Sequence, residues 1–194
     1  MLTAIGDVMR EAYDRNWITT KDGNCSLKRS EKKTLYITPS GVRKNIIYPE
    51  SILRIPISRG KLGLNKNASG ELEMHWLLQK SHKGTRCVLH LHPTYIVAAM
   101  MAGWNLQALA KKFPEVYRYT KVGKNVGLWE ATSKGLADDT FFQMQRNGEV
   151  YYDIVGQTAH GACAIGKNPW EAFCHIERLE HICKIALASG VKPE

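Results

Sequence analysis

Two histidines at alternate positions of an apolar run are the residues best suited to chemistry in this 194-residue sequence. His90 and His92 belong to Arg86–His92, a run whose composition predicts a buried strand. Because strand side chains alternate between faces, both imidazoles point to one side, close enough to chelate a single divalent cation. A lone strand histidine is more often an ordinary core residue, but a pair at this spacing favours a metal site.

A third histidine would complete the three-histidine geometry, with one open position, that is typical of catalytic zinc. We expect His160 to supply it, because Gly161 lets the chain turn tightly and small apolar residues flank His160 and Gly161. Other histidines fall in expected helices, where packing explains them as readily, or beside a lysine–glycine turn that faces solvent. They stay open as alternatives: His75, His175 and His181 in helices, and His82 at the turn.

Glu71 is a candidate acid/base group, near the start of an expected helix that Ser69 can cap. A helix N-terminus offers unpaired N–H groups and the positive end of the helix dipole, and so favours an anion. A carboxylate beside a metal can transfer protons, although a first-turn glutamate often serves the dipole alone. Taken singly, Gly23-Asn24 and Ser40-Gly41 are ordinary turn residues.

The elements that must position these residues alternate along the chain. The pattern predicts helices over 2–16, 70–80, 94–102, 105–112, 133–146 and 169–189, strands over 25–29, 34–38, 52–57 and 86–92, and strand-like runs within 150–165. Residues 113–122 are ambiguous, and we interpret them as a strand after Pro114. The last helix has the clearest start, with Asn168 as N-cap, Pro169 in its first turn and Glu171 in a capping box. Interleaved helices and strands predict an α/β layered fold with a central sheet, in a single domain over 1–194.

Composition excludes several classes of protein. Five cysteines, an odd number with no CxxC pair, argue against a disulfide scaffold or a zinc ribbon. The longest apolar stretch, 96–102, is far shorter than the roughly 20 residues that span a bilayer. The first fifteen residues lack the apolar run of a signal peptide. We therefore expect a cytoplasmic protein with reduced thiols and no membrane partner.

The positive charge is concentrated in one segment. The chain carries +9 overall, and residues 21–66 hold eleven Lys/Arg against three Asp/Glu. Such a bias attracts anions, either nucleic acid or a phosphorylated small molecule. No RGG tract, zinc knuckle, basic-zipper pattern or RRM signature is present, so a nucleic-acid partner is not expected.

Six segments follow one another in a specific order and spacing: GNCSLKR (23–29), ITPSG (37–41), SGELEMH (69–75), CVLHLHP (87–93), AHG (159–161) and a closing helix near 166–180. Together they resemble the class II aldolase/adducin family, and within it the sugar-phosphate aldolases of the fuculose-phosphate type. The resemblance implies a three-layer α/β/α sandwich around a mostly antiparallel central sheet. It also implies a homotetramer with active sites at subunit boundaries. The apolar run 100–104 is compatible with association as well, although Met100 and Trp104, four residues apart on one helix face, taken alone favour a place in the core.

The resemblance assigns roles residue by residue. It implies one Zn²⁺ per subunit on His90, His92 and His160, and an acid/base role for Glu71, because the neighbouring Glu73 occupies the wrong place in the motif. A catalytic tyrosine would be Tyr117 or Tyr119, and we choose Tyr119. The resemblance also implies that five residues bind the substrate phosphate: Asn24, Ser40, Gly41, Ser69 and Gly70.

The implied activity is that of a zinc-dependent aldolase. Such an enzyme cleaves a ketose 1-phosphate into dihydroxyacetone phosphate and an aldehyde through a metal-stabilised enediolate. Two features depart from the pattern: Ser69-Gly70 stands where sugar aldolases often carry two serines, and the chain ends 34 residues after His160, without the family's tyrosine-bearing tail. Alternatives within the family are a methylthioribulose-1-phosphate dehydratase and a pentulose-phosphate epimerase. The non-enzymatic alternative is an adducin-like assembly module.

Overall fold

The computed structural model describes residues 2–81, 84 and 86–192. Its helices are α1 (Thr3–Asp14), α2 (Leu72–Ser81), α3 (Thr94–Met101), α4 (Leu106–Lys111), α5 (Pro114–Tyr119), α6 (Lys134–Gln143) and α7 (Pro169–Ala188). Its strands are β1 (Asn24–Arg29), β2 (Thr34–Ile37), β3 (Leu53–Ser58), β4 (Lys61–Leu62), β5 (Cys87–Leu91), β6 (Gln145–Arg146), β7 (Glu149–Val150), β8 (Ile154–Gln157) and β9 (Gly161–Gly166). Apart from residues 113–122 and the additional short strands β4 and β6, the helices and strands follow the order that the sequence predicts.

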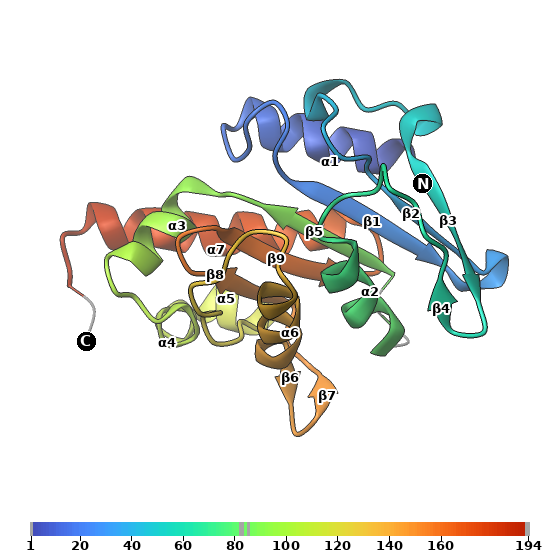
Figure 1. Cartoon of the computed structure of the whole chain (residues 1–194). Helices are drawn as coiled ribbons and strands as arrows, with labels where there is room; N and C mark the ends of the chain where they lie inside the picture. The colour runs from blue at the N-terminus through green and yellow to red at the C-terminus, as the bar shows by residue number, and fades with distance from the viewer. Residues whose placement is uncertain (1, 82–83, 85, 193–194) are drawn as a thin grey trace.

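The main sheet has seven strands in the order β4-β3-β2-β1-β5-β9-β8, and every neighbouring pair is antiparallel. Two isolated parallel bridges, Val122 to Ile154 and Val126 to Gln157, extend it beyond β8. β6 and β7 form a separate hairpin that projects below the sheet in Figure 1. The expected mostly antiparallel central sheet is therefore confirmed, and β5 lies in its interior between β1 and β9.

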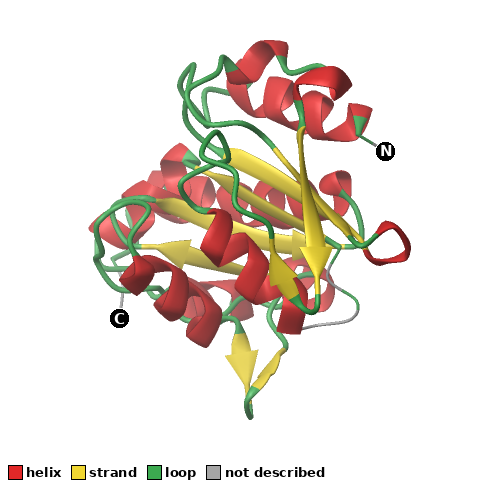
Figure 2. Ribbon diagram, turned by 45° about the vertical axis from the view of Figure 1, so that its right-hand side comes forward, coloured by secondary structure: helices red, strands yellow, loops and turns green. Residues whose placement is uncertain are grey.

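Helices cover both faces of this sheet (Figures 1 and 2). α1, α3 and α7 pack together on one face, and α2 and α6 pack against each other on the opposite face. The alternation along β5 accounts for both layers: Leu89 and Leu91 belong to the apolar cluster under α7, whereas Val88 belongs to the cluster under α2. His90 shares the face of Val88. The metal-site candidates therefore lie on the α2 side of the sheet.

Two expected boundaries differ from the structure. The segment after Pro114 is the short helix α5 and not a strand, because Pro114 occupies the first helical turn and Thr120 donates its backbone N–H to Val116 O over 2.8 Å. The helix expected over 133–146 ends at Gln143. The residues that follow form the β6–β7 hairpin, whose two-residue turn, Asn147-Gly148, has positive φ at both positions.

The start of the last helix is as expected in most respects. The Asn168 side chain accepts the backbone N–H of Glu171 over 2.9 Å and caps α7. The Glu171 carboxylate bonds the backbone N–H of Lys167 instead of Asn168, so the capping box closes one residue earlier than predicted. This cap fixes α7 against the end of β9.

The apolar run after α3 belongs mostly to the core. Met100 and Trp104 are buried in the cluster under α7, which confirms the core interpretation for these two residues, whereas Met101 is exposed. All five cysteines are free thiols. None of the helices in the described part of the chain is long and apolar enough to cross a lipid bilayer.

Candidate metal centre and its cleft

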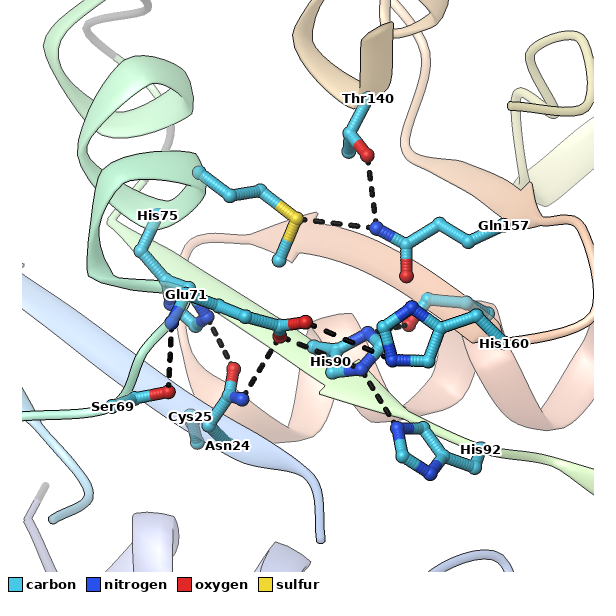
Figure 3. Close-up of polar contacts among 12 residues, drawn as sticks. Asn24, Cys25, Ser69, Glu71, His75, His90, His92, Thr140, Gln157 and His160 are labelled. Carbon is cyan, nitrogen blue, oxygen red and sulfur yellow. Dashed lines mark hydrogen bonds and ion pairs between the residues drawn. The ribbon is translucent and has the colours of Figure 1, made fainter. Parts of the chain in front are cut away.

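The sheet brings the three predicted histidines together. His90 lies in β5, His92 directly follows that strand, and His160 ends the turn between β8 and β9. Because β9 pairs with β5, the turn before β9 lies beside the end of β5. The ligand nitrogens of the three imidazoles lie within 4.8 Å of one another (Figure 3). This spacing is compatible with three ligands of one metal ion.

The hydrogen bonds of the cluster leave lone pairs directed inward. His90 Nδ1 lies 3.1 Å from the carbonyl oxygen of Ala162 and donates its proton there, so His90 Nε2 carries a lone pair. That lone pair faces His92 Nε2 at 2.9 Å. Nδ1 of His160 is buried and has no hydrogen-bond partner among the described residues. Three imidazoles whose ligand nitrogens gather this closely fit a cation, and imidazole nitrogens suit zinc.

Burial keeps His90 and His92 neutral. Desolvation lowers the pKa of His90 well below its ordinary value, and the neighbouring imidazoles of His92 and His160 lower it further. Desolvation also lowers the pKa of His92, again with help from His160. Neutral imidazole is the form that binds metals, so these two rings are prepared for a ligand role at neutral pH.

Gly161 permits the close approach of His160 to β5. A Cβ atom at this position would lie 2.3 Å from Leu91 O, 2.8 Å from His92 Cδ2 and 3.1 Å from His90 Cε1. The first distance is far below any van der Waals contact. Glycine is therefore required here by space, in addition to the freedom of turning that the sequence suggested.

Glu71 reaches over the histidine cluster from the segment before α2. Its Oε2 lies 3.5 Å from His90 Nε2 and its Oε1 lies 3.8 Å from His160 Nε2. The side chain is buried, and its backbone N–H donates to Ser69 Oγ over 3.3 Å. Glu73 is exposed on α2. Of these two carboxylates, Glu71 is the one at the cluster.

The predicted phosphate residues line the same cleft as the histidines and Glu71. The cleft has a volume of about 200 Å³. Its lining includes all five predicted residues: Asn24, Ser40, Gly41, Ser69 and Gly70. The loop that contains Ser40 and the loop that leads to Ser69 are joined. The backbone N–H of Ser40 donates to Asn67 O over 2.8 Å, and Pro39 forms a β-bridge with Ala68. Three segments distant in sequence thus surround one small space.

The cleft also holds residues that sequence reasoning missed: Lys21, Asp22, Lys44, Ala131 and Thr132. Lys44 is 2% exposed, and its Nζ donates to Pro39 O at 3.1 Å and Val42 O at 3.2 Å. Burial lowers the pKa of Lys44, opposed by the charge of Asp22. The basic segment was visible in the sequence, but which of its lysines lies beneath the cleft was not. Nothing in the sequence pointed to Thr132.

The alternative histidines lie elsewhere. His75 and His175 are buried in α2 and α7 with polar partners of their own, and His181 is exposed on α7. His82 lies outside the described residues.

The candidate tyrosines are absent from the lining of the cleft. Tyr117 and Tyr119 are exposed on α5, at 66% and 52%. A larger cavity of about 860 Å³ lies against α7 and α5, and its lining contains none of the predicted site residues. Within one chain, therefore, the structure does not bring either tyrosine to the histidine cluster.

Comparison with known proteins adds four findings. A family model described as the class II aldolase and adducin N-terminal domain matches residues 3–187. The chain is 24% identical to an L-fuculose phosphate aldolase of Methanocaldococcus jannaschii, over 93% of this chain and 92% of the relative. It is also 24% identical to a methylthioribulose-1-phosphate dehydratase of Emericella nidulans, over 94% of this chain and 85% of the relative. The crystal structure of an L-fuculose-1-phosphate aldolase from Thermus thermophilus superposes with a TM-score of 0.75 at 22% identity, covering 99% of this chain and 97% of that one.

Proposed function

The chain belongs to the class II aldolase and adducin N-terminal domain family, and from this premise we propose that it is a zinc-dependent aldolase. Its proposed substrate is a ketose 1-phosphate, which it cleaves into dihydroxyacetone phosphate and an aldehyde. The observation that carries the proposal is the position of Glu71, whose carboxylate oxygens lie 3.5 Å from His90 and 3.8 Å from His160. A proton-transferring group thus adjoins a three-histidine metal site.

His90, His92 and His160 would hold one zinc ion per subunit. When bound, zinc would act as a Lewis acid that polarises the ketose carbonyl and stabilises the negative charge that develops when the adjoining carbon loses a bonding partner. The protein residues then have three tasks: to bind the phosphate, to exclude water and to move protons.

The substrate phosphate would occupy the space between the three loops. Asn24, Ser40 and Ser69 supply side-chain donors, and the backbone N–H groups of Gly41 and Gly70 supply two more. Gly70 replaces the second serine of the common motif, and its backbone N–H can take over that hydroxyl's hydrogen bond. The basic segment 21–66 surrounds two of these loops and favours a dianionic ligand.

Glu71 would carry the proton of the carbon that changes bonding. In the cleavage direction the C3–C4 bond breaks, the C4 hydroxyl passes its proton to the Glu71 carboxylate and becomes the aldehyde carbonyl, and the electron pair remains at C3. Protonation of C3 by Glu71 then gives dihydroxyacetone phosphate, and in the condensation direction Glu71 removes the same proton.

Tyr119 would assist from a neighbouring subunit. Its hydroxyl is not part of the cleft of its own chain, so a role at the C4 oxygen requires a second copy. We therefore propose a homotetramer of single-domain subunits, working in the cytoplasm, with active sites at subunit boundaries.

The test is a panel of ketose 1-phosphates incubated with the zinc-loaded protein, with enzymatic detection of dihydroxyacetone phosphate. Release of this product from at least one sugar supports the proposal. The similarity to a methylthioribulose-1-phosphate dehydratase makes water loss the second candidate, so the same samples are analysed by mass spectrometry for a product 18 Da lighter. Pentulose 5-phosphates are added to detect epimerisation. A zinc-loaded protein that leaves every sugar unchanged favours the adducin-like alternative.

A further inference from the structure

A buried row of polar side chains leads from the sheet to Glu71. Ser26 Oγ lies 2.7 Å from His75 Nδ1, and His75 Nε2 lies 2.5 Å from Asn24 Oδ1. Asn24 Nδ2 donates to Glu71 Oε2 over 3.0 Å. Figure 3 shows His75 above Asn24 and Asn24 directed at the Glu71 carboxylate. None of these four side chains is more than 7% exposed.

The row has a single direction of donation. Oδ1 of Asn24 is a carbonyl oxygen and can only accept, so His75 must carry its proton on Nε2. Nδ1 of His75 is then an acceptor and receives the hydroxyl proton of Ser26. Each donor therefore points toward Glu71. Burial lowers the pKa of His75 to about 3, which keeps the ring neutral and preserves this pattern.

The direction matters because Asn24 has two possible orientations. In the observed one, its amide nitrogen faces Glu71, and the second proton of that nitrogen can serve a substrate oxygen in the cleft that Asn24 lines. A rotation of 180° would place the carbonyl oxygen against the Glu71 carboxylate and toward the phosphate. The Glu71 carboxylate and the substrate phosphate, both anions, would then each face a hydrogen-bond acceptor, which is unfavourable. The N–H of His75 selects between these orientations.

We propose that His75 is a positioning residue that holds the Asn24 amide with its nitrogen toward Glu71. Through this contact it orients the acid/base carboxylate over the histidine cluster and keeps a donor available to the substrate phosphate. The inference rests on the proposed function for its effect on turnover, but the orientation itself exists without substrate. Ser26 lies at the far end, where its hydroxyl donates to Nδ1 of a His75 ring protonated at Nε2.

The first experiment examines the tautomer directly in the metal-free protein. Histidine side chains are labelled with ¹⁵N, and long-range ¹H–¹⁵N correlation spectra are recorded near neutral pH, with His75→Gln used to assign the His75 signals. We expect a neutral ring protonated at Nε2. A ring protonated at Nδ1 would donate to Ser26 and turn the Asn24 carbonyl toward Glu71, and that result overturns the proposal.

The second experiment compares two substitutions in the zinc-loaded enzyme. His75→Leu keeps the volume but removes the donor, and we expect kcat to fall about 10- to 100-fold with zinc content unchanged. His75→Gln retains an N–H near the position of Nε2 and restores most of the lost turnover. Equal losses in the two variants contradict a positioning role.

A double substitution separates positioning from general instability. If His75 acts through Asn24, then His75→Leu adds little to the loss in Asn24→Ala, whereas independent effects would multiply. Gln79→Leu is the matched control. It removes another buried polar side chain of α2, which bonds Arg86 O at 2.8 Å away from the cleft, and it should lower thermal stability without lowering kcat. Multiplicative losses of kcat in the double variant, or a comparable loss of kcat in Gln79→Leu, contradict the inference. An inactive wild-type enzyme would contradict the aldolase proposal alone, because the tautomer is read without turnover.

Discussion

Glu71 and His90 face each other at the base of the cleft, with Oε2 of the carboxylate 3.5 Å from Nε2 of the imidazole. Both side chains are buried. Nε2 of His90 carries a lone pair because Nδ1 of the same ring donates its proton to Ala162 O. A negative oxygen and a lone pair at this separation repel each other unless a cation or a proton lies between them. The pair is therefore organised for a positive charge.

Replacement of Glu71 by Gln should abolish most turnover and leave the metal in place. The amide keeps the size of the side chain but cannot transfer a proton, so kcat should fall by roughly 10² to 10⁴. Zinc content is measured on the same samples by atomic emission. Glu73→Gln, an exposed change two residues away, is the control and should retain activity. The assignment would be reversed by an active Glu71→Gln together with an inactive Glu73→Gln.

Removal of one imidazole should empty the metal site. In His92→Ala two of the three converging rings remain, and two ligands hold zinc far more weakly than three. After gel filtration without added metal, we expect less than stoichiometric zinc in this variant and stoichiometric zinc in His181→Ala, whose ring is exposed on α7. Full occupancy in His92→Ala would place the metal elsewhere.

Gly161→Ala should loosen the cluster without removing a ligand. The added methyl would meet Leu91 O at 2.3 Å, so β5 and the turn before β9 must separate. We expect a loss of about 1–3 kcal/mol in the free energy of unfolding, together with weaker zinc binding. Denaturant titration and competition with a chelator measure the two effects. Wild-type values in both would show that the turn adapts freely.

The stability of the metal-free protein should fall as the pH decreases below 6.5. Burial lowers the pKa of His75 from 6.5 to about 3, so between these values the unfolded chain binds a proton that the folded chain does not. Each pH unit in this window then costs up to about 1.4 kcal/mol. Urea titrations between about pH 4 and 6 should give a flatter dependence for His75→Gln than for the wild type. Parallel slopes would contradict the buried neutral ring.

Active sites shared between subunits predict complementation. Light scattering should give the mass of four chains, and Tyr119→Phe should be impaired although its hydroxyl lies outside the cleft of its own chain. Refolding Tyr119→Phe together with Glu71→Gln should restore about a quarter of wild-type activity, because a quarter of the sites in a cyclic tetramer then combine an intact Glu71 with an intact Tyr119. An active monomer, or no recovery in the mixture, would show that each site is complete within one chain.

The sequence predicted those features that depend on local periodicity. His90 and His92 share a face because a strand alternates, and the cap of α7 forms because Asn168 and Pro169 have strong positional preferences. The motif order also located Glu71 and the three loops, which the sheet brings to one cleft. These signals are contained in a few neighbouring residues.

The features that escaped prediction depend on packing between distant segments. Pro114 is compatible with either a strand or a helix start, and only the packing around Val116 selects the helix. The burial of Lys44 beneath the cleft results from the fold of the loop after β2, and its neighbours in sequence are exposed or partly exposed. Likewise His75 looked like an ordinary helix residue, because its partners Ser26 and Asn24 are about fifty positions away.

The position of β5 between β1 and β9 has a consequence for how the protein is made. His90 pairs with Asn24 on one side and with Cys163 on the other, so the site joins early and late parts of the chain. Pairings of such long sequence separation close large loops and form slowly. On the ribosome, β1 and β5 can meet as soon as β5 emerges, but His160 arrives only after most of the chain has been synthesised. Capture of a metal by the complete histidine set would therefore come late, and until β9 emerges a nascent chain exposes a two-histidine strand with no partner at its β9 edge.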